Sequence, residues 1–189
     1  CLGIRRGYNG LINGDIVELD ARSVDGIQIR GGTMLYTARS PEFKTDAGLD
    51  KARDICRYRG IDALVAIGGD GTFRGALDLS RRGVPAVGIP ATIDNDISCT
   101  QYTIGFDTAC NTALEAVDRL RDTMQSHERC SVVEVMGRQS GALAMYVGVA
   151  CGALAILIPE KETDMERDVF ARMRQSRIQH RNHHIVIVA

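Results

Sequence analysis

The sequence predicts an α/β fold in which a mostly parallel sheet is flanked by helices, in three layers. From residue 61 onward, five short apolar segments alternate with four segments of helical periodicity. Such alternation requires right-handed crossovers, and these place helices on both faces of a parallel sheet. Two of the predicted strands also end in turns rich in glycine or acidic residues, at the strand ends where open parallel sheets bind ligands.

The composition is that of an ordinary globular protein, with 189 residues of which 44% are hydrophobic and 25% are charged. No apolar run approaches the roughly 18 residues that a membrane-spanning helix needs. The 23 basic and 24 acidic residues balance to a net charge of −1, whereas bulk nucleic-acid binding normally needs a basic surface. We therefore expect small-molecule ligands, with no nucleic-acid partner and no membrane partner.

The six cysteines are scattered, and no pair has the spacing of a zinc site or a redox motif. The first ten residues include Arg5 and Arg6 and lack the apolar centre of a signal peptide. These observations predict reduced thiols and a cytoplasmic location.

The first 60 residues are less regular and predict a strand at 16–19, a turn at 30–33 and a helix at 49–56. Residues 1–4 have the character of the end of a strand, and the last predicted strand ends at Ala189. We therefore expect residues 1–189 to form a single α/β lobe for binding a nucleotide and a sugar phosphate. We expect this lobe to be a fragment that lacks its first strand and a C-terminal lobe.

The segment 63–67 is wholly apolar, which is typical of a strand covered on both faces. After a glycine-rich turn at 68–71, apolar side chains at helical spacing predict a helix at 72–82. Gly83 is suited to a left-handed C-terminal cap, and the next strand is predicted at 84–89.

Beyond a long connection, helices and strands continue to alternate. The strongest helical signal is the recurrence of apolar residues at spacings of three and four between positions 109 and 124. The predicted elements are a helix at 107–125, a strand at 131–136, a helix at 140–151, a strand at 153–158, a helix at 165–179 and a strand at 185–188.

The turn at 68–72 has the sequence Gly-Gly-Asp-Gly-Thr. Its glycines let the backbone approach a polyphosphate closely, and the N-terminus of the following helix offers unpaired N–H groups and the positive end of a dipole. Asp70 is then suited to hold Mg²⁺ on the phosphates. The alternative is a structural turn in which Thr72 caps the helix.

The turn at 90–96, Pro-Ala-Thr-Ile-Asp-Asn-Asp, carries two carboxylates at alternate positions. In an extended loop, Asp94 and Asp96 would project to the same side, about 6 to 7 Å apart along the chain. One could accept a proton from an attacking hydroxyl while the other orients a metal or a partner, as phosphoryl transfer requires. The alternative is a loop that folds on hydrogen bonds of its own side chains.

Arg138 follows the strand predicted at 131–136. An arginine in this place can bind a sugar phosphate or a transferring phosphoryl group with two hydrogen bonds. Its alternative role is a surface cation at a helix N-terminus, where a positive charge is slightly unfavourable. We therefore favour a functional role.

Several motifs together resemble the successive signatures of the 6-phosphofructokinase family. They occur in the family's order and spacing over essentially the whole chain. The glycine turn is shared with NAD and lipid kinases, but the segments 92–96 and 136–138 distinguish the phosphofructokinases from them. The motifs lie at residues 7–11, 30–33, 68–72, 90–96, 103–109, 132–138 and 158–160.

The resemblance implies a Rossmann-like fold and a kinase of glycolysis that transfers the γ-phosphoryl group of ATP to the 1-hydroxyl of fructose 6-phosphate. Asp94 would accept the hydroxyl proton, and Thr92, Asp96 and Arg138 would be the other catalytic residues. Asp70 would hold Mg²⁺. The ATP-binding residues would be Arg39, Ser40, Gly69, Asp70, Gly71 and Thr72.

The resemblance also implies the sugar-phosphate site and the assembly. Arg129 resembles the arginine that the family sends across a subunit interface to the 6-phosphate, so a homo-oligomer, expected to be a tetramer, is implied. The resemblance gives weaker support for the family's allosteric control, because Ala21 and Leu154 stand where bacterial relatives have an arginine and an acid. The substrate-binding residues would be Thr92, Ile93, Asp94, Arg129, Met136, Gly137 and Arg138.

Two alternatives to this function remain. Pyrophosphate-dependent members tend to have an acid at the position of Gly71 and a lysine at that of Ala91; neither is present, so ATP is the predicted donor. The second alternative is a noncatalytic paralogue that senses sugar phosphates or nucleotides. The presence of both Asp94 and Asp96 argues against it, because a site that only binds needs no proton acceptor beside a phosphate.

Overall fold

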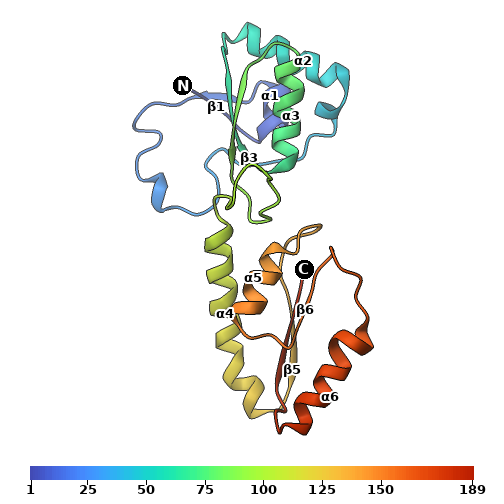
Figure 1. Ribbon diagram of the computed structural model, residues 1–189. Coiled ribbons are helices and arrows are strands. Elements are labelled where there is room, and N and C mark those ends of the chain that lie inside the picture. The colour runs from blue at the N-terminus through green and yellow to red at the C-terminus, as the bar shows by residue number, and fades with distance from the viewer. The chain divides into compact units, whose positions relative to one another are not determined.

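The computed structural model describes residues 1–189, which form two compact units, residues 1–89 and residues 90–189 (Figure 1). The single lobe expected from the sequence stays a prediction, and each unit is described by itself below. None of the helices combines the length and the apolar character that crossing a membrane requires.

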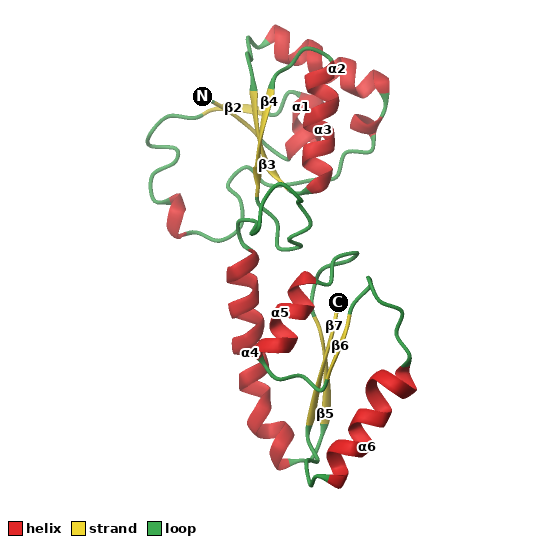
Figure 2. Cartoon of the chain, viewed as in Figure 1, coloured by secondary structure: helices red, strands yellow, loops and turns green.

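The first unit contains two small sheets and three helices (Figure 2). β1 and β2 pair antiparallel, and β3 and β4 are neighbours in the other sheet. Two short 3-10 turns lie between β2 and α2. The elements are β1 (Leu2–Ile4), α1 (Gly7–Asn13), β2 (Ile16–Glu18), α2 (Asp46–Tyr58), β3 (Leu64–Gly68), α3 (Asp70–Arg81) and β4 (Ala86–Pro90), with the 3-10 turns at Ile27–Ile29 and Glu42–Lys44.

The core of this unit lies between α1, α2 and α3. The rings of Tyr8 and Phe43 stack with their centroids 4.0 Å apart. Gly75 of α3 faces these rings, and a Cβ atom at this position would lie 2.6 Å from the Tyr8 ring, so α3 requires a glycine there. The buried apolar residues are Leu11, Ile12, Phe43, Leu49, Ala52, Cys56, Leu79 and Val84.

The second unit is a three-stranded parallel sheet in the order β5-β7-β6, with helices on both faces. Ile185 and Ile187 of the central strand pack against α4 and α5, whereas Val186 belongs to the cluster on the α6 side. Its elements are α4 (Phe106–Ser126), β5 (Cys130–Glu134), α5 (Ala142–Ala150), β6 (Ala155–Leu157), a π-helical turn (Glu166–Phe170), α6 (Ala171–Ile178) and β7 (His184–Val188).

All five strands and all four helices predicted beyond residue 61 are present, with shifted ends. The helix predicted at 72–82 begins at Asp70, and the one predicted at 165–179 begins as a π-helical turn. α1 was not predicted from residue pattern. The prediction that the first apolar strand is covered on both faces is wrong in this structure, because Val65 and Ile67 are each 64% exposed.

Candidate active site

The residues predicted to bind the nucleotide and those predicted to bind the sugar phosphate fall in different units. Residues 39–40 and 69–72 belong to the first unit, and the sugar-phosphate residues from Thr92 to Arg138 belong to the second. The two groups are therefore described separately.

The glycine turn leads from β3 directly into α3. A Cβ atom on Gly68 would lie 2.5 Å from the Thr72 hydroxyl. The first turn of α3 therefore packs so closely against the end of β3 that only glycine fits at position 68. Gly69, with extended backbone, occupies the N-cap position, and no side chain caps the helix. The alternative in which Thr72 caps the helix is therefore wrong. The first N–H groups of α3 have no intrahelical partner and are suited to bind an anion.

Asp70 is the first residue of α3 and is half-buried. Arg74, one turn later, forms an ion pair with its carboxylate at 2.9 Å. The phenol of Tyr8 donates a hydrogen bond of 2.5 Å to the backbone oxygen of Thr72. Burial, and secondly the charge of Asp78, raise the pKa of Tyr8 to about 12, so the phenol keeps the proton that it donates. Our sequence reasoning missed this role, although Tyr8 lies in the motif at 7–11.

Arg39 and Ser40 lie before the turn at 42–44. The Ser40 hydroxyl accepts a weak hydrogen bond of 3.4 Å from the backbone N–H of Phe43, while Arg39 is exposed. No hydrogen bond or ion pair joins either residue to the glycine turn within the first unit. Their part in nucleotide binding stays a prediction.

Asp94 lies half-buried in the loop that follows β4. Its backbone N–H donates to the Thr92 hydroxyl at 3.2 Å, and its backbone oxygen accepts a hydrogen bond of 2.6 Å from the Ser140 hydroxyl. Burial and, secondly, the nearby Asp96 raise the pKa of Asp94, whereas Arg138 opposes this rise. The second unit therefore places Asp96 and Arg138 where their charges act on the pKa of the predicted base.

The extended geometry predicted for this loop is wrong. Asn95, between the two acids, has a φ of 50°, in the left-handed region, so the backbone bends where the spacing argument assumed a straight strand. The charge of Asp96 nevertheless reaches Asp94, as the raised pKa of Asp94 indicates.

A tight turn after β5 places Arg138. The backbone N–H of Ser140 donates to the Gly137 oxygen at 2.8 Å, and a Cβ atom on Gly137 would lie 2.2 Å from the Ser140 oxygen. Arg138 itself has a φ of 54° and is exposed, whereas Met136 is 72% exposed before it. Arg138 precedes α5 in this turn, and its charge opposes the rise in the pKa of Asp94; its functional role stays a prediction.

Arg129 is not brought to this group. It immediately precedes β5, while Arg138 follows that strand, so the five strand residues at roughly 3.3 Å each lie between them. The Arg129 side chain is exposed, and its backbone oxygen accepts a hydrogen bond of 3.1 Å from the N–H of His184. Arg129 therefore lies at the end of the sheet opposite to the Asp94 loop.

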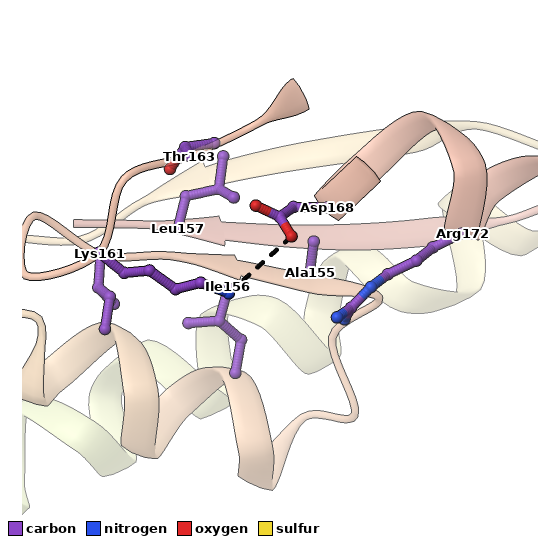
Figure 3. Close-up of a pocket in the computed structure, with 8 residues that line it drawn as sticks. Ala155, Ile156, Leu157, Lys161, Thr163, Asp168 and Arg172 are labelled. Atoms are coloured by element: carbon purple, nitrogen blue, oxygen red, sulfur yellow. Dashed lines mark ion pairs between the residues drawn. The ribbon is translucent and has the colours of Figure 1, made fainter. Parts of the chain in front are cut away.

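A small recess elsewhere in the second unit contains none of the predicted site residues (Figure 3). Its carboxylate, Asp168, lies 3.9 Å from the Lys161 ammonium and accepts a hydrogen bond from the backbone N–H of Asp164. Arg167, which binds both of its oxygens, holds the pKa of Asp168 well below its usual range. The hydrogen bond between Asp168 and the Asp164 N–H lies at the start of the helical segment 166–178, so Asp168 has a structural role in this recess. It is lined by Ala155, Ile156, Leu157, Ile158, Lys161, Thr163, Asp168 and Arg172.

Known proteins that are similar to this chain are phosphofructokinases. The chain is 54% identical over 188 residues to an ATP-dependent 6-phosphofructokinase of Clostridium botulinum. It is 52% identical to the enzyme of the same name from Lysinibacillus sphaericus. Both alignments cover 100% of this chain and 59% of the relative, so the chain spans about three fifths of the length of these relatives.

Solved structures agree with the predicted α/β fold. The phosphofructokinase of Saccharomyces cerevisiae matches with a TM-score of 0.88 at 34% identity, covering 100% of this chain and 29% of the yeast chain. The pyrophosphate-dependent phosphofructokinase of Marinobacter aquaeolei matches with a TM-score of 0.78 at 23% identity, covering 98% of this chain and 50% of that one, and supports the fold alone. The phosphofructokinase family model matches residues 1–189. The chain therefore belongs to the phosphofructokinase family.

Proposed function

We propose that the protein containing this chain transfers the γ-phosphoryl group of ATP to the 1-hydroxyl of fructose 6-phosphate. The observation that carries this proposal is Asp94, a half-buried carboxylate whose pKa is raised by burial and by Asp96, with Arg138 within electrostatic reach. A carboxylate with a raised pKa is a stronger proton acceptor than an ordinary surface acid. The activity of the two bacterial relatives, as their names state it, supports the same reaction.

In the proposed reaction, the Asp94 carboxylate takes the proton of the 1-hydroxyl while that oxygen forms a bond to the γ-phosphorus. The bond between the γ-phosphorus and the bridging oxygen breaks, and ADP leaves with the bonding electron pair. Arg138 would neutralise part of the negative charge on the transferring group, as positioned cations do in phosphoryl transfer. Thr92 and Asp96 would keep the loop and its second charge in place.

The first unit would bind the nucleotide. The uncapped N-terminus of α3 and the close turn at Gly69 would hold its phosphates, with Gly71 and Thr72 beside them. Asp70 suits Mg²⁺, which is commonly held by one or two carboxylates together with substrate phosphates. The Asp70 carboxylate offers the hard oxygen donors that the ion prefers, and Mg²⁺ would take the place of Arg74, which pairs with this carboxylate. When bound, Mg²⁺ would reduce the negative charge on the phosphates of ATP.

Gly71 supports ATP rather than pyrophosphate as the donor. A Cβ atom built on Gly71 meets nothing within 4 Å, and the residue is exposed in the first turn of α3. The space that an acidic side chain would fill in a pyrophosphate-dependent member is therefore open in the first unit.

The sugar phosphate would be bound by the second unit and by a second subunit. Thr92, Ile93, Met136, Gly137 and Arg138 would contact the sugar from the loop after β4 and the turn after β5. The position of Arg129 at the opposite end of β5 supports the proposal that it serves the site of a neighbouring subunit in a homo-oligomer, expected to be a tetramer.

A regulatory protein without catalytic activity is the competing proposal. Asp94 argues against it, because a half-buried carboxylate beside a second acid repels a phosphate ligand and brings no benefit to binding alone.

The test is Asp94→Asn in the full-length protein. We expect kcat for fructose 6-phosphate to fall by about a thousandfold or more while KM changes little, since the amide cannot accept the proton but keeps the shape. The activity should be measured with ATP and with pyrophosphate as donors, and ATP should be the better one. Asp62→Asn, an exposed residue before β3, is the matched control and should leave kcat unchanged. Wild-type turnover by Asp94→Asn would exclude the assigned base.

A further inference from the structure

The connection between β4 and α4 folds back on itself beside the end of β4. The backbone N–H of Ile104 donates to the oxygen of Pro90 at 2.8 Å, and Ala91 and Ile104 form a parallel bridge. The loop that carries Asp94 therefore lies directly against the segment 101–104, within the second unit.

Thr103 joins the two arms of this connection from a buried position. Its side chain is only 4% exposed, and its hydroxyl donates a hydrogen bond of 2.5 Å to the backbone oxygen of Thr92. Its backbone N–H donates to Oδ1 of Asn95 at 3.0 Å. Thr103 thus holds the loop on both sides of Asp94, at residue 92 and at residue 95.

Asn95 completes this arrangement with the other end of its amide. Its Nδ2 atom donates to the backbone oxygen of Gln101 at 3.2 Å, and its backbone has a φ of 50°. Glycine would permit this backbone but would lose both amide contacts. Aspartate would keep the acceptor but would oppose the Gln101 oxygen and add a third negative charge between Asp94 and Asp96. Asparagine, which tolerates the left-handed region better than most residues, satisfies all of these requirements.

We propose that Asn95 and Thr103 are positioning residues that fix the directions of the Asp94 and Asp96 carboxylates for phosphoryl transfer. This inference rests on the function proposed above. Asn95 is the residue between the two acids, so its backbone angle decides how their side chains diverge. Three hydrogen bonds connect the Asp94 loop to the segment 101–103. A catalytic loop that is held at several points keeps its side chains in the orientation that the reaction needs.

The first test is Thr103→Val in the full-length enzyme, which keeps the volume and removes the hydroxyl. We expect kcat to fall by about a hundredfold, the loss that a misplacement of about 1 Å can cause. KM for ATP should change little, because the predicted nucleotide residues belong to the first unit. Thr103→Ser, which keeps the hydroxyl, should recover most of kcat.

The second test is the pH profile of kcat/KM for fructose 6-phosphate. In Thr103→Val and in Asn95→Gly, a loosened loop should hydrate Asp94 and weaken the influence of Asp96. The acid limb of the profile should therefore move to lower pH. In Asn95→Asp, the added negative charge should move the same limb to higher pH. A residue that only stabilises the fold would not produce these opposite shifts.

The matched control is Thr112→Val on α4, which also removes a hydroxyl that donates to a backbone oxygen, that of Thr108 at 2.9 Å. It should keep the wild-type kcat and pH profile. Wild-type kcat and an unmoved acid limb in both Asn95→Gly and Thr103→Val would overturn the inference, as would a loss of activity that only follows the loss of folded protein in thermal melts. Asp94→Asn, assayed in parallel, separates the two proposals, because its full activity would refute the proposed function itself.

Discussion

His184 is a buried polar residue of the second unit, although its charged neighbours in the sequence predict a place on a solvated helix face. It begins β7 with 5% exposure, and its Nε2 atom is buried without a hydrogen-bond partner. Burial, and then the neighbouring His183 and Arg177, lower the pKa of His184. The folded protein therefore keeps this imidazole neutral at pH values where an unfolded chain would bind a proton.

This difference predicts a loss of stability in mild acid. As the pH falls below about 6.5, the unfolded state takes up a proton that folded His184 does not bind, so the free energy of unfolding decreases by up to about 1.4 kcal/mol per pH unit. The loss ends at the lowered pKa of folded His184. Thermal melts between pH 7.5 and 5.5 should show a smaller drop for His184→Leu than for the wild type. His127→Leu, which changes an exposed histidine, should keep the wild-type slope; equal slopes for all three proteins would contradict the assignment.

Residue types made the Asp94 group predictable, and backbone conformation made its geometry unpredictable. A loop with two acids and a later Gly-Arg pair, together with the family resemblance, predicted a phosphoryl-transfer site, and this site stays a prediction. The left-handed backbone at Asn95 accompanies side-chain hydrogen bonds to Gln101 and Thr103, and that at Arg138 accompanies the tight turn from Gly137 to Ser140; residue types alone do not predict these bonds.

Among the elements, α2 is the helix with a clear side-chain cap. Thr45 has extended backbone, and its hydroxyl accepts a hydrogen bond of 3.1 Å from the N–H of Gly48. The same hydroxyl donates to the oxygen of Glu42 at 2.7 Å, which ties α2 to the short 3-10 turn before it. α2 presents Leu49, Ala52 and Cys56 to the core of the first unit, so its start matters for that core.

Thr45→Ala should lower the free energy of unfolding by about 1 kcal/mol, the usual cost of losing an N-cap side chain. Urea denaturation followed by circular dichroism would measure it. Thr45→Ser should restore most of the loss because it keeps the capping oxygen. Thr37→Ala, in an exposed loop, serves as the control. If Thr45→Ala and Thr37→Ala unfolded alike, the capping role would be wrong.

Apolar periodicity predicted neither the π-helical turn before α6 nor the exposed face of β3. Asp164 accepts hydrogen bonds from the N–H groups of Glu166 and Arg167, and Asp168 binds back to the Asp164 N–H, so a π-helical turn precedes α6. Apolar spacing contains no signal for this turn. An all-apolar segment likewise does not reveal which of its faces is covered, and β7 is buried throughout most of its length whereas β3 is not.

On the scale of the whole molecule, the residues predicted to bind the nucleotide belong to one compact unit and those predicted to bind the sugar phosphate belong to the other, and within the second unit Arg129 is set apart from the Asp94 loop. If Arg129 serves the site of a neighbouring subunit, activity depends on assembly as well as on the fold of one chain. In an oligomer in which each site takes residues from two subunits, two inactive variants can complement each other.

Mixed full-length oligomers of Arg129→Ala and Asp94→Asn chains should recover activity that neither variant has alone. In a mixed pair, one site receives Asp94 from the first chain and Arg129 from the second, so random pairing should restore about a quarter of the wild-type kcat. Each variant, dissociated and reassembled alone, is the control. An absence of recovery in mixed oligomers of confirmed composition would mean that Arg129 does not act across the interface.

From the sequence alone, the alternation of strands and helices, the family resemblance and the residue types of the candidate site could be derived, because they depend on local periodicity and on motifs of a few neighbouring residues. The tertiary structure decided which strand faces are covered and that α3 starts at Asp70. It also decided that Arg129 and Arg138 lie at opposite ends of β5, and that Thr103 holds the loop of Asp94. The covered faces depend on which elements pack against each strand, and the loop of Asp94 depends on side-chain hydrogen bonds such as that of Thr103, neither of which apolar periodicity encodes.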